Sequence, residues 1–228
     1  MIPIKNISRY TCLLAISLLL GALPADAQRR KAEIQEPDTT AFFKGFAVSA
    51  DLIGPLQLLL SDYGQYEAAL RINLKDRWFP VFELGLGKAS HDDIVTKVSY
   101  KTSAPYGRVG LDFNLLKNKH DIYRLYGGFR YAYTNYKCDI SRDDMEDPVW
   151  KTKSSFSEEG ISCYQHWLEG VFGIDASIMG PFHLGWTVRY KRRLMHKEGD
   201  IGNTWYVPGF GVNDTDNLTL NFNVIIDI

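Results

Sequence analysis

The chain has 228 residues, with 26 Lys and Arg against 27 Asp and Glu, so its formal net charge is −1. This balance argues against a general nucleic-acid-binding protein, because such proteins concentrate positive charge to contact phosphates. Apolar residues make up 45% of the chain and aromatic residues 13%, enough for one folded domain. The longest nearly unbroken apolar run, residues 12–23, is shorter than the about 20 residues of a membrane-spanning helix. The sequence therefore excludes a helical membrane protein.

The N-terminus has the layout of a secretory signal peptide over residues 1–27. Lys5 and Arg9 form a basic start, residues 12–23 form the apolar core, and residues 25–27 (Ala-Asp-Ala) supply a small-residue cleavage site. We therefore predict that the chain is exported and cleaved after the last of these residues.

Two segments of different composition follow the cleavage site. Residues 28–43 are charged and polar and predict a short periplasmic tether. From Gly45 onward the apolar residues recur at period two, which places alternate side chains on opposite faces of extended strands. We predict eight strands, over residues 45–54, 65–74, 79–88, 105–115, 122–137, 164–178, 181–192 and 216–228. The domain over residues 44–228 is therefore expected to be all-β.

The connections between the predicted strands alternate in length. Short turns are expected at residues 75–78, 116–121 and 179–180, and longer loops at 55–64, 89–104, 138–163 and 193–215. This alternation is typical of outer-membrane barrels, and most predicted strands reach the about ten residues that a tilted transmembrane strand needs. We therefore predict a closed, antiparallel, up-and-down transmembrane β-barrel of eight strands. An even strand number places both termini at the short-turn, periplasmic end.

The two faces of the predicted strands differ in content. One face is apolar and has no charged residue in mid-strand, whereas the other carries six acidic and six basic residues. Charges enclosed in a narrow lumen must be paired, because an unpaired buried charge costs several kcal/mol. The apolar face is therefore expected to face lipid, unlike that of a soluble eight-stranded barrel. The predicted lumen ion-pair network comprises Asp51, Glu67, Arg71, Glu83, Arg108, Asp112, Arg124, Arg130, Glu169, Asp175, Arg189 and Lys191.

Two apolar stretches within the predicted loops leave the strand count open. Residues 56–60 and 205–212 are unusual for loops that water surrounds. We expect them to pack against each other above the barrel or to bind a partner chain. The second stretch also leaves open a longer sheet, so that ten strands is the alternative count.

Four segments of the chain form a recognisable combination. They are residues 54–57 (Gly-Pro-Leu-Gln), 61–67 (Ser-Asp-Tyr-Gly-Gln-Tyr-Glu), 205–211 (Trp-Tyr-Val-Pro-Gly-Phe-Gly) and the C-terminal strand 218–228. With the eight-strand layout, they resemble an uncharacterised outer-membrane β-barrel family of the Bacteroidota. The resemblance covers most of the mature chain and implies an outer-membrane location. It brings no catalytic motif, so it carries over no functional residue.

The expected function is a structural or interaction role rather than a pore or an enzyme. The interior of an eight-stranded barrel is just wide enough to be filled by side chains, which excludes a large pore. The enzymatic alternative is an outer-leaflet lipid A hydrolase of the deacylase-like barrel type, which needs a nucleophile and a base on one strand face. The expected His-x-Ser spacing occurs at none of the five His. The Cys and His residues have no zinc-site spacing, and we expect no metal or cofactor.

The external end of the predicted barrel carries two further candidates. Arg192, Arg193 and Lys197 crowd the end of the seventh strand, where they would contact lipopolysaccharide phosphates or simply extend their charges to water at the rim. Cys138 and Cys163 flank the longest loop and are the only cysteines left after signal removal. Export permits a disulfide between them, provided that the strand register brings the two side chains together. An envelope protein partner is also expected, without a sequence signal for its identity.

Overall fold

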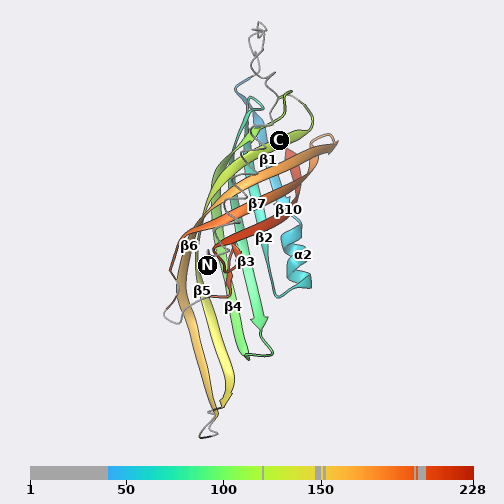
Figure 1. The fold of residues 1–228 in the computed structure, drawn as a ribbon. Helices are drawn as coiled ribbons and strands as arrows, with labels where there is room; N and C mark the ends of the chain where they lie inside the picture. The colour runs from blue at the N-terminus through green and yellow to red at the C-terminus, as the bar shows by residue number, and fades with distance from the viewer. Residues whose placement is uncertain (1–40, 120, 147–149, 151–152, 198, 200–203) are drawn as a thin grey trace, which may run out of the picture. The chain divides into compact units, whose positions relative to one another are not determined.

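The computed structural model describes residues 41–228 except 120, 147–149, 151–152, 198 and 200–203, so the predicted signal peptide and almost all of the tether lie outside the described residues. Eight long strands are β1 (Phe43–Asp51), β2 (Tyr63–Leu74), β3 (Trp78–Asp92), β4 (Val98–Asn114), β5 (Arg124–Glu146), β6 (Lys153–Met179), β7 (Phe182–Lys197) and β10 (Asp216–Asp227). They are hydrogen-bonded in a closed antiparallel ring, in the order β1-β10-β7-β6-β5-β4-β3-β2 (Figure 1). The predicted eight-stranded up-and-down barrel is confirmed.

Side chains close the turns on both sides of β3. Between β2 and β3, Lys75 and Asp76 both have φ of 55°, and the Asn73 side chain forms hydrogen bonds with the Asp76 backbone N–H and carboxylate. Between β3 and β4, the backbone N–H groups of Thr96 and Val95 donate to the Asp93 carboxylate and lower its pKa. These side-chain hydrogen bonds add to the backbone hydrogen bonds of the two turns, from Arg77 N–H to the Leu74 carbonyl at 3.1 Å and from Lys97 N–H to the Asp93 carbonyl at 2.8 Å.

Two of the four predicted long loops are mainly strand instead. The prediction of a loop over residues 138–163 is wrong, because β5 and β6 continue through most of them as one hairpin, and β3 and β4 likewise cover much of 89–104. The outer ends of these hairpins lack the alternation of apolar residues that identifies strands in the sequence. Backbone pairing in a hairpin that has already formed does not require an apolar face.

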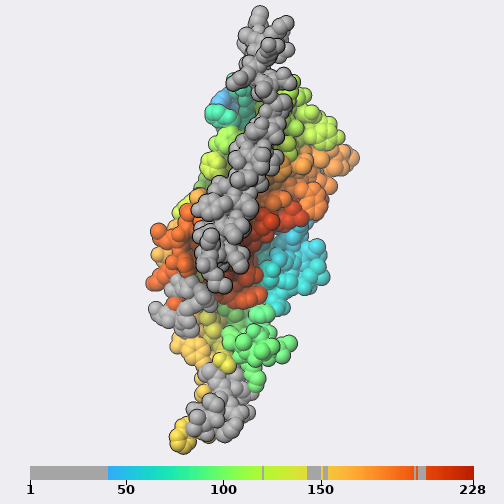
Figure 2. Space-filling view, in the orientation of Figure 1, coloured from blue at the N-terminus to red at the C-terminus, as the bar shows by residue number. Residues whose placement is uncertain are grey.

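A helix, α2 (Ile53–Leu60), lies beside the barrel wall where the short β1 ends. The residue pairs between β1 and β10 run along Ala47–Asp51, with backbone hydrogen bonds from Phe46 to Ile228 and from Leu52 to Phe222 at the two ends, whereas β10 continues beside β7 as far as Asp216. Beyond the end of β1, α2 packs against β2 and β10, and Figure 2 shows it standing out from the surface beside the red β10 strand. The chain carries no capping signature there beyond Asp51, so the sequence does not predict this helix.

The segment Trp205–Val212 folds back into the barrel. Its two-residue strands β8 (Tyr206–Val207) and β9 (Gly211–Val212) pair with each other and with no strand of the barrel ring. The ten-strand alternative is therefore wrong. The Tyr206 and Phe210 side chains are buried among inward-facing aromatic residues of β4, β5 and β6. We call residues 205–212 the lumen plug. We expected this segment to pack with residues 56–60 above the barrel, but it inserts into the lumen.

The outer surface of the barrel wall is apolar around the ring. The exposed side chains that define this apolar band include Phe46, Val48, Leu70, Phe82, Leu84, Val109, Phe129, Phe172, Ile174, Trp186, Val188 and Leu220. No helix in the described part of the chain is long and apolar enough to cross a membrane.

Candidate functional site

A cluster of ion pairs around Glu83 occupies the middle of the lumen. Arg130 Nε lies 3.1 Å from the Glu83 carboxylate, Arg189 Nη1 2.9 Å and Arg108 Nη1 3.2 Å. Arg108 and Arg189 also contact Glu67, and both lie within ion-pair distance of Glu169. All of these side chains are almost completely buried, so each charge depends on its neighbours for compensation.

A second group of ion pairs shares Asp112 with the first. Arg130 donates to both oxygens of Asp112 at 2.6 and 2.8 Å, a bidentate pair that the planar guanidinium favours. Arg71 donates to Asp175, reaches Asp112 at 3.8 Å, and lies 4.5 Å from the ring centre of Tyr126. The structure thus brings four of the five predicted lumen arginines within ion-pair distance of predicted carboxylates.

The remaining residues of the predicted network have other partners. Arg124 pairs at 2.7 Å with Asp227, which is absent from the predicted set although it shares the inward face of β10 with Asn221 and Asn223. Asp51 accepts hydrogen bonds from the backbone N–H groups at the start of α2 and from that of Phe222. The same period of two that identifies the other carboxylates also applies to Asp227.

Lys191 and Arg108 hold the lumen plug in place. The Lys191 ammonium donates to the carbonyl oxygens of Gly209 and Phe210 at 2.8 and 3.1 Å, and Arg108 donates to Gly209 at 2.7 Å. Gly209 has φ of +82°, and a Cβ there would lie 2.5 Å from the Tyr106 ring, so this position requires glycine. Lys191 therefore donates hydrogen bonds to the plug instead of joining the predicted ion-pair network. No sequence pattern reports this contact.

The ion-pair clusters leave little free space in the middle of the lumen, whereas a larger cavity of about 280 Å³ lies beside the plug, lined by Lys191, Tyr206 and Asn221. The cavity beside Glu83 and Arg189 has a volume of about 20 Å³, and another beside Arg71 and Arg124 about 30 Å³. A single water needs roughly 10–15 Å³ on this measure. Each of these two cavities therefore has room for one or two waters and is too small to pass a solute.

The two cysteines are buried and are free thiols, so the predicted disulfide is not formed. Cys138 pairs with Ile161 and Cys163 with Tyr136, which makes the cysteines diagonal rather than direct neighbours on the inner face. The two side chains still meet, because a hydrogen bond between the thiols is the main cause of the raised pKa of Cys138. Both Sγ atoms also approach the Ile161 carbonyl oxygen, at 3.9 and 3.8 Å.

Three histidines have partners that do not resemble a serine nucleophile and base pair. His91 contacts the Asp62 carboxylate at 2.8 Å and stacks on Trp205, while His166 Nδ1 lies 2.6 Å from the Tyr131 hydroxyl. His183 lies 3.3 Å from Asp227. For these three imidazoles, the hydrogen-bond and ion-pair partners within the described residues include no serine.

The predicted cationic cluster at the end of β7 is divided. Arg192 and Lys197 are exposed, whereas Arg193 is half-buried and donates to the Asn213 side chain at 2.7 Å. Arg193 therefore secures the loop before β10. Of these three residues, only Arg192 and Lys197 keep their charges directed to the outside.

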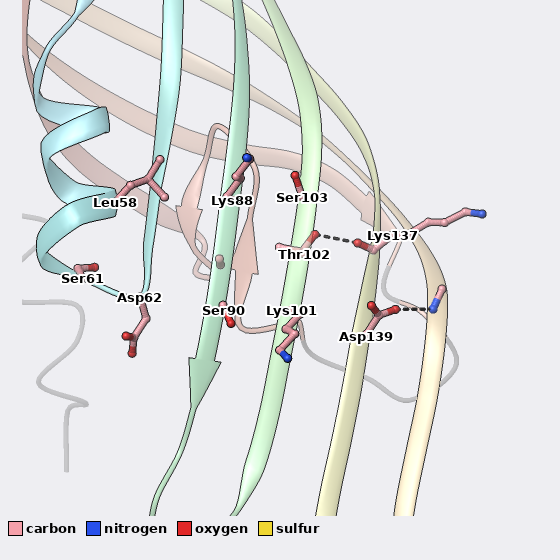
Figure 3. Close-up of a pocket in the computed structure, with 12 residues that line it drawn as sticks. Leu58, Ser61, Asp62, Lys88, Ser90, Lys101, Thr102, Ser103, Lys137 and Asp139 are labelled. Atoms are coloured by element: carbon pink, nitrogen blue, oxygen red, sulfur yellow. Dashed lines mark hydrogen bonds between the residues drawn. The ribbon is translucent and has the colours of Figure 1, made fainter.

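Another cationic group, which the sequence does not predict, lies on the outer wall. Lys88 of β3, Lys101 of β4 and Lys137 of β5 line a hollow of about 820 Å³ (Figure 3). Lys88 pairs in register with Ser103, and Lys101 pairs with Ser90 on one side and Asp139 on the other. Lys88 and Lys137 end two predicted strands and Lys101 lies in a predicted loop, so only the observed pairing of three strands places them together. We call this group the lysine hollow.

The chain is similar to one protein family over most of its length and, more remotely, to solved structures. A family model described as a domain of unknown function (DUF6048) matches residues 7–227. The attachment invasion locus protein Ail of Yersinia pestis, solved with the heparin analogue sucrose octasulfate, is 10% identical, with 80% of this chain and 93% of that chain covered and a TM-score of 0.36. A major outer membrane protein from Thermus thermophilus is 15% identical, with 81% and 98% covered and a TM-score of 0.45. No curated protein matches the chain.

Proposed function

This chain belongs to the DUF6048 family, and we propose that it is an integral outer-membrane β-barrel protein with a structural or interaction role and without a large pore. Both termini are placed in the periplasm by this proposal. The observation that carries it is the inverted polarity of the barrel: an apolar band outside and a closed, ion-paired lumen inside.

The polarity argument rests on what each face would cost in water. Side chains such as Leu84, 73% exposed, and Phe129, 55% exposed, would form an apolar surface far larger than monomeric soluble proteins show. A soluble barrel would direct these residues inward and its arginines outward. Hydrocarbon around the band removes this cost, and it also explains why every strand is paired on both edges.

Aromatic residues at the two borders of the band support the same placement. Trp78, Tyr123 and Phe182 are exposed near the short-turn end, and Tyr66, Tyr131, Tyr133 and Tyr190 are exposed near the other. Tyr and Trp favour membrane interfaces, where the ring is apolar and the polar atom reaches water. The distance along β3 between these borders, about nine residues, matches a tilted transmembrane strand.

Two measurements test this function. Fractionation of the native host should find the chain in the outer membrane, and the purified mature chain in planar bilayers should give no stable conductance. A soluble periplasmic chain, or steady channels of large conductance, would contradict the proposal. The conductance of a variant without residues 205–212 measures how much the closure of the lumen depends on the plug.

The interaction role centres on the part of the wall beyond the band, where the β5–β6 hairpin projects farthest (Figure 1). We expect Arg192 and Lys197 to contact lipopolysaccharide there and a protein partner of the envelope to bind. Crosslinking in intact cells followed by mass spectrometry identifies that partner. Crosslinks confined to the periplasmic turns would place the interaction surface at the wrong end.

We also propose that the barrel lacks enzymatic activity, since none of the partners described for His91, His166 and His183 is a serine. Lipid A from cells with and without the gene should have the same number of acyl chains by mass spectrometry. A gene-dependent change in acyl number would favour the hydrolase alternative.

A further inference from the structure

We propose that the lysine hollow binds the phosphate groups of lipid A in the outer leaflet. This inference rests on the proposed membrane location and adds a defined site on β3, β4 and β5, three strands that do not border β7. Its ligand class is an anionic lipid that carries phosphate.

The hollow lies immediately beyond the apolar band. On β3 the outward residues run from Phe82 and Leu84 through Leu86 to Lys88, and on β5 they run from Phe129 to Lys137. The lysines therefore begin where the apolar side chains end, next to the border tyrosines. That depth is where lipid phosphates lie beside a barrel embedded by its apolar band.

The three ammonium groups are available to an external anion. Lys88, Lys101 and Lys137 are exposed, and none has a carboxylate within 4 Å among the described residues. Two carboxylates share the hollow, but Asp139 accepts the Gly160 backbone N–H at 2.7 Å and Asp62 contacts His91. The hollow therefore contains three positive and two negative side chains, and its net charge is +1.

The spacing of the lysines suits a phosphate held between strands. Lys88, Ser103 and Lys137 occupy one row across β3, β4 and β5, and adjacent strands are about 4.8 Å apart. In Figure 3 the Lys137 side chain extends away from Ser103, so a phosphate above Ser103 meets both Lys88 and Lys137 once the flexible Lys137 side chain swings toward it. Lys101 begins the next row, so a group of a few phosphate oxygens can meet three cations.

An apolar wall next to the lysines distinguishes a lipid from a soluble anion. Leu58 of α2 lines the hollow, and the neighbouring Leu59 and Leu60 are 82% and 78% exposed. Figure 3 shows Leu58 reaching from α2 toward the strands, on the side of the hollow where Lys88 lies. Free phosphate gains nothing from these leucines, whereas the acyl chains of lipid A can cover them. The combination of phosphate-binding charge and apolar wall therefore selects an anionic lipid.

Binding of lipids to the full mature chain in detergent tests the proposal by native mass spectrometry. The probes are phosphorylated lipid A, the same lipid A after phosphatase treatment, and phosphatidylethanolamine. We expect the wild-type chain to bind phosphorylated lipid A at least about tenfold more tightly than the other two, because each lysine near a membrane surface adds attraction toward anionic lipid. Equal binding of the phosphorylated and dephosphorylated forms would overturn the proposal.

Variants assign the preference to the hollow. The triple variant Lys88→Gln, Lys101→Gln, Lys137→Gln should lose the preference for phosphorylated lipid A. The matched control Lys75→Gln, Lys117→Gln, in turns at the other end, should retain it. A triple variant that keeps the preference refutes the site. An Arg192→Gln, Lys197→Gln variant should keep part of the preference, because the lysine hollow is intact in it, and complete loss there would refute the assignment to the hollow.

Two further readouts separate the ways in which the idea can fail. Inorganic phosphate at millimolar concentration should not displace the lipid, and full displacement would mean a simple anion site. Boiling-dependent gel migration verifies that each variant is folded. Because binding is measured in detergent, absence of the chain from the outer membrane would overturn the proposed function while leaving the site itself to be judged by these titrations.

Discussion

The middle and the outer part of the barrel interior are closed by different physical means. The middle is filled by interlocking ion pairs around Glu83, all contributed by strand residues. The outer part is filled by an aromatic cluster in which Tyr206 and Phe210 of a distant loop pack against Trp167 and Tyr106. A narrow barrel can thus be sealed either from its own wall or by an inserted segment, and here Arg108 belongs to both.

The largest effect is expected from breaking the ion-pair cluster. Glu83→Gln leaves Arg108, Arg130 and Arg189 short of one buried negative charge, and breaking a buried pair costs about 3–5 kcal/mol. Urea unfolding of the detergent-folded barrel, followed by tryptophan fluorescence, measures this loss. The exposed Glu158→Gln is the control and should change stability by less than about 0.5 kcal/mol. Equal stability of the two variants would mean that the cluster is well hydrated.

Opening the aromatic seal should have the next largest effect. Phe210→Ala removes a completely buried ring and should destabilise the barrel by about 3 kcal/mol, toward the lower end of the range for such changes because the plug can partly relax. The same unfolding assay measures it, with Val212→Ala as the control at the exposed end of the plug. If Phe210→Ala proves more costly than Glu83→Gln, the inserted loop and not the wall is the main closure.

The stability of α2 should depend on the Asp51 carboxylate. Asp51→Ala removes the acceptor for the backbone N–H groups of Ile53 and Gly54, and the loss of such a cap costs about 1 kcal/mol. Protease sensitivity near residues 52–62 should rise together with the small loss of stability. Asp51→Asn keeps one of the two acceptor oxygens, so it should restore part of the protection.

The smallest effect on stability is expected at the short-turn end of the barrel. Arg124→Gln breaks a pair with Asp227 that is about one-third exposed on the acid side, and such pairs contribute about 0–1 kcal/mol. Its unfolding midpoint should fall further in low salt than in high salt. A loss as large as that of Glu83→Gln would show that the whole lumen behaves as one dry network.

The sequence is most informative where a pattern repeats along a strand. The period of two identifies the ring of eight strands and most of the charged lumen, because inward carboxylates and arginines occupy alternate positions of their strands. Asp227 obeys the same period, but it ends a strand whose inward face is otherwise uncharged, so the predicted network omits it. Apolar–polar alternation cannot reveal the outer parts of β5 and β6, where apolar residues are too few to form a pattern.

What the sequence does not reveal depends on contacts between distant residues. The apolar residues 205–212 can be recognised as unusual, but only the three-dimensional structure shows that Arg108 and Lys191 bind their carbonyl groups inside the barrel. The lysine hollow is hidden for a related reason, because its lysines lie on three different strands and meet only through strand pairing. The offset of Cys138 and Cys163 likewise follows from a register that spacing alone does not fix.

The shortness of β1 has a consequence for how the ring closes. β1 and β10 share five residue pairs, whereas β10 and β7 share eleven, and the first and last strands meet at this same seam. Amide hydrogens of Ala47–Asp51 and Asn223–Asp227 are therefore expected to exchange with deuterium sooner than those between β4, β5 and β6. The seam is accordingly expected to close last during assembly and to open first on heating, and α2 covers the interval that β1 does not reach.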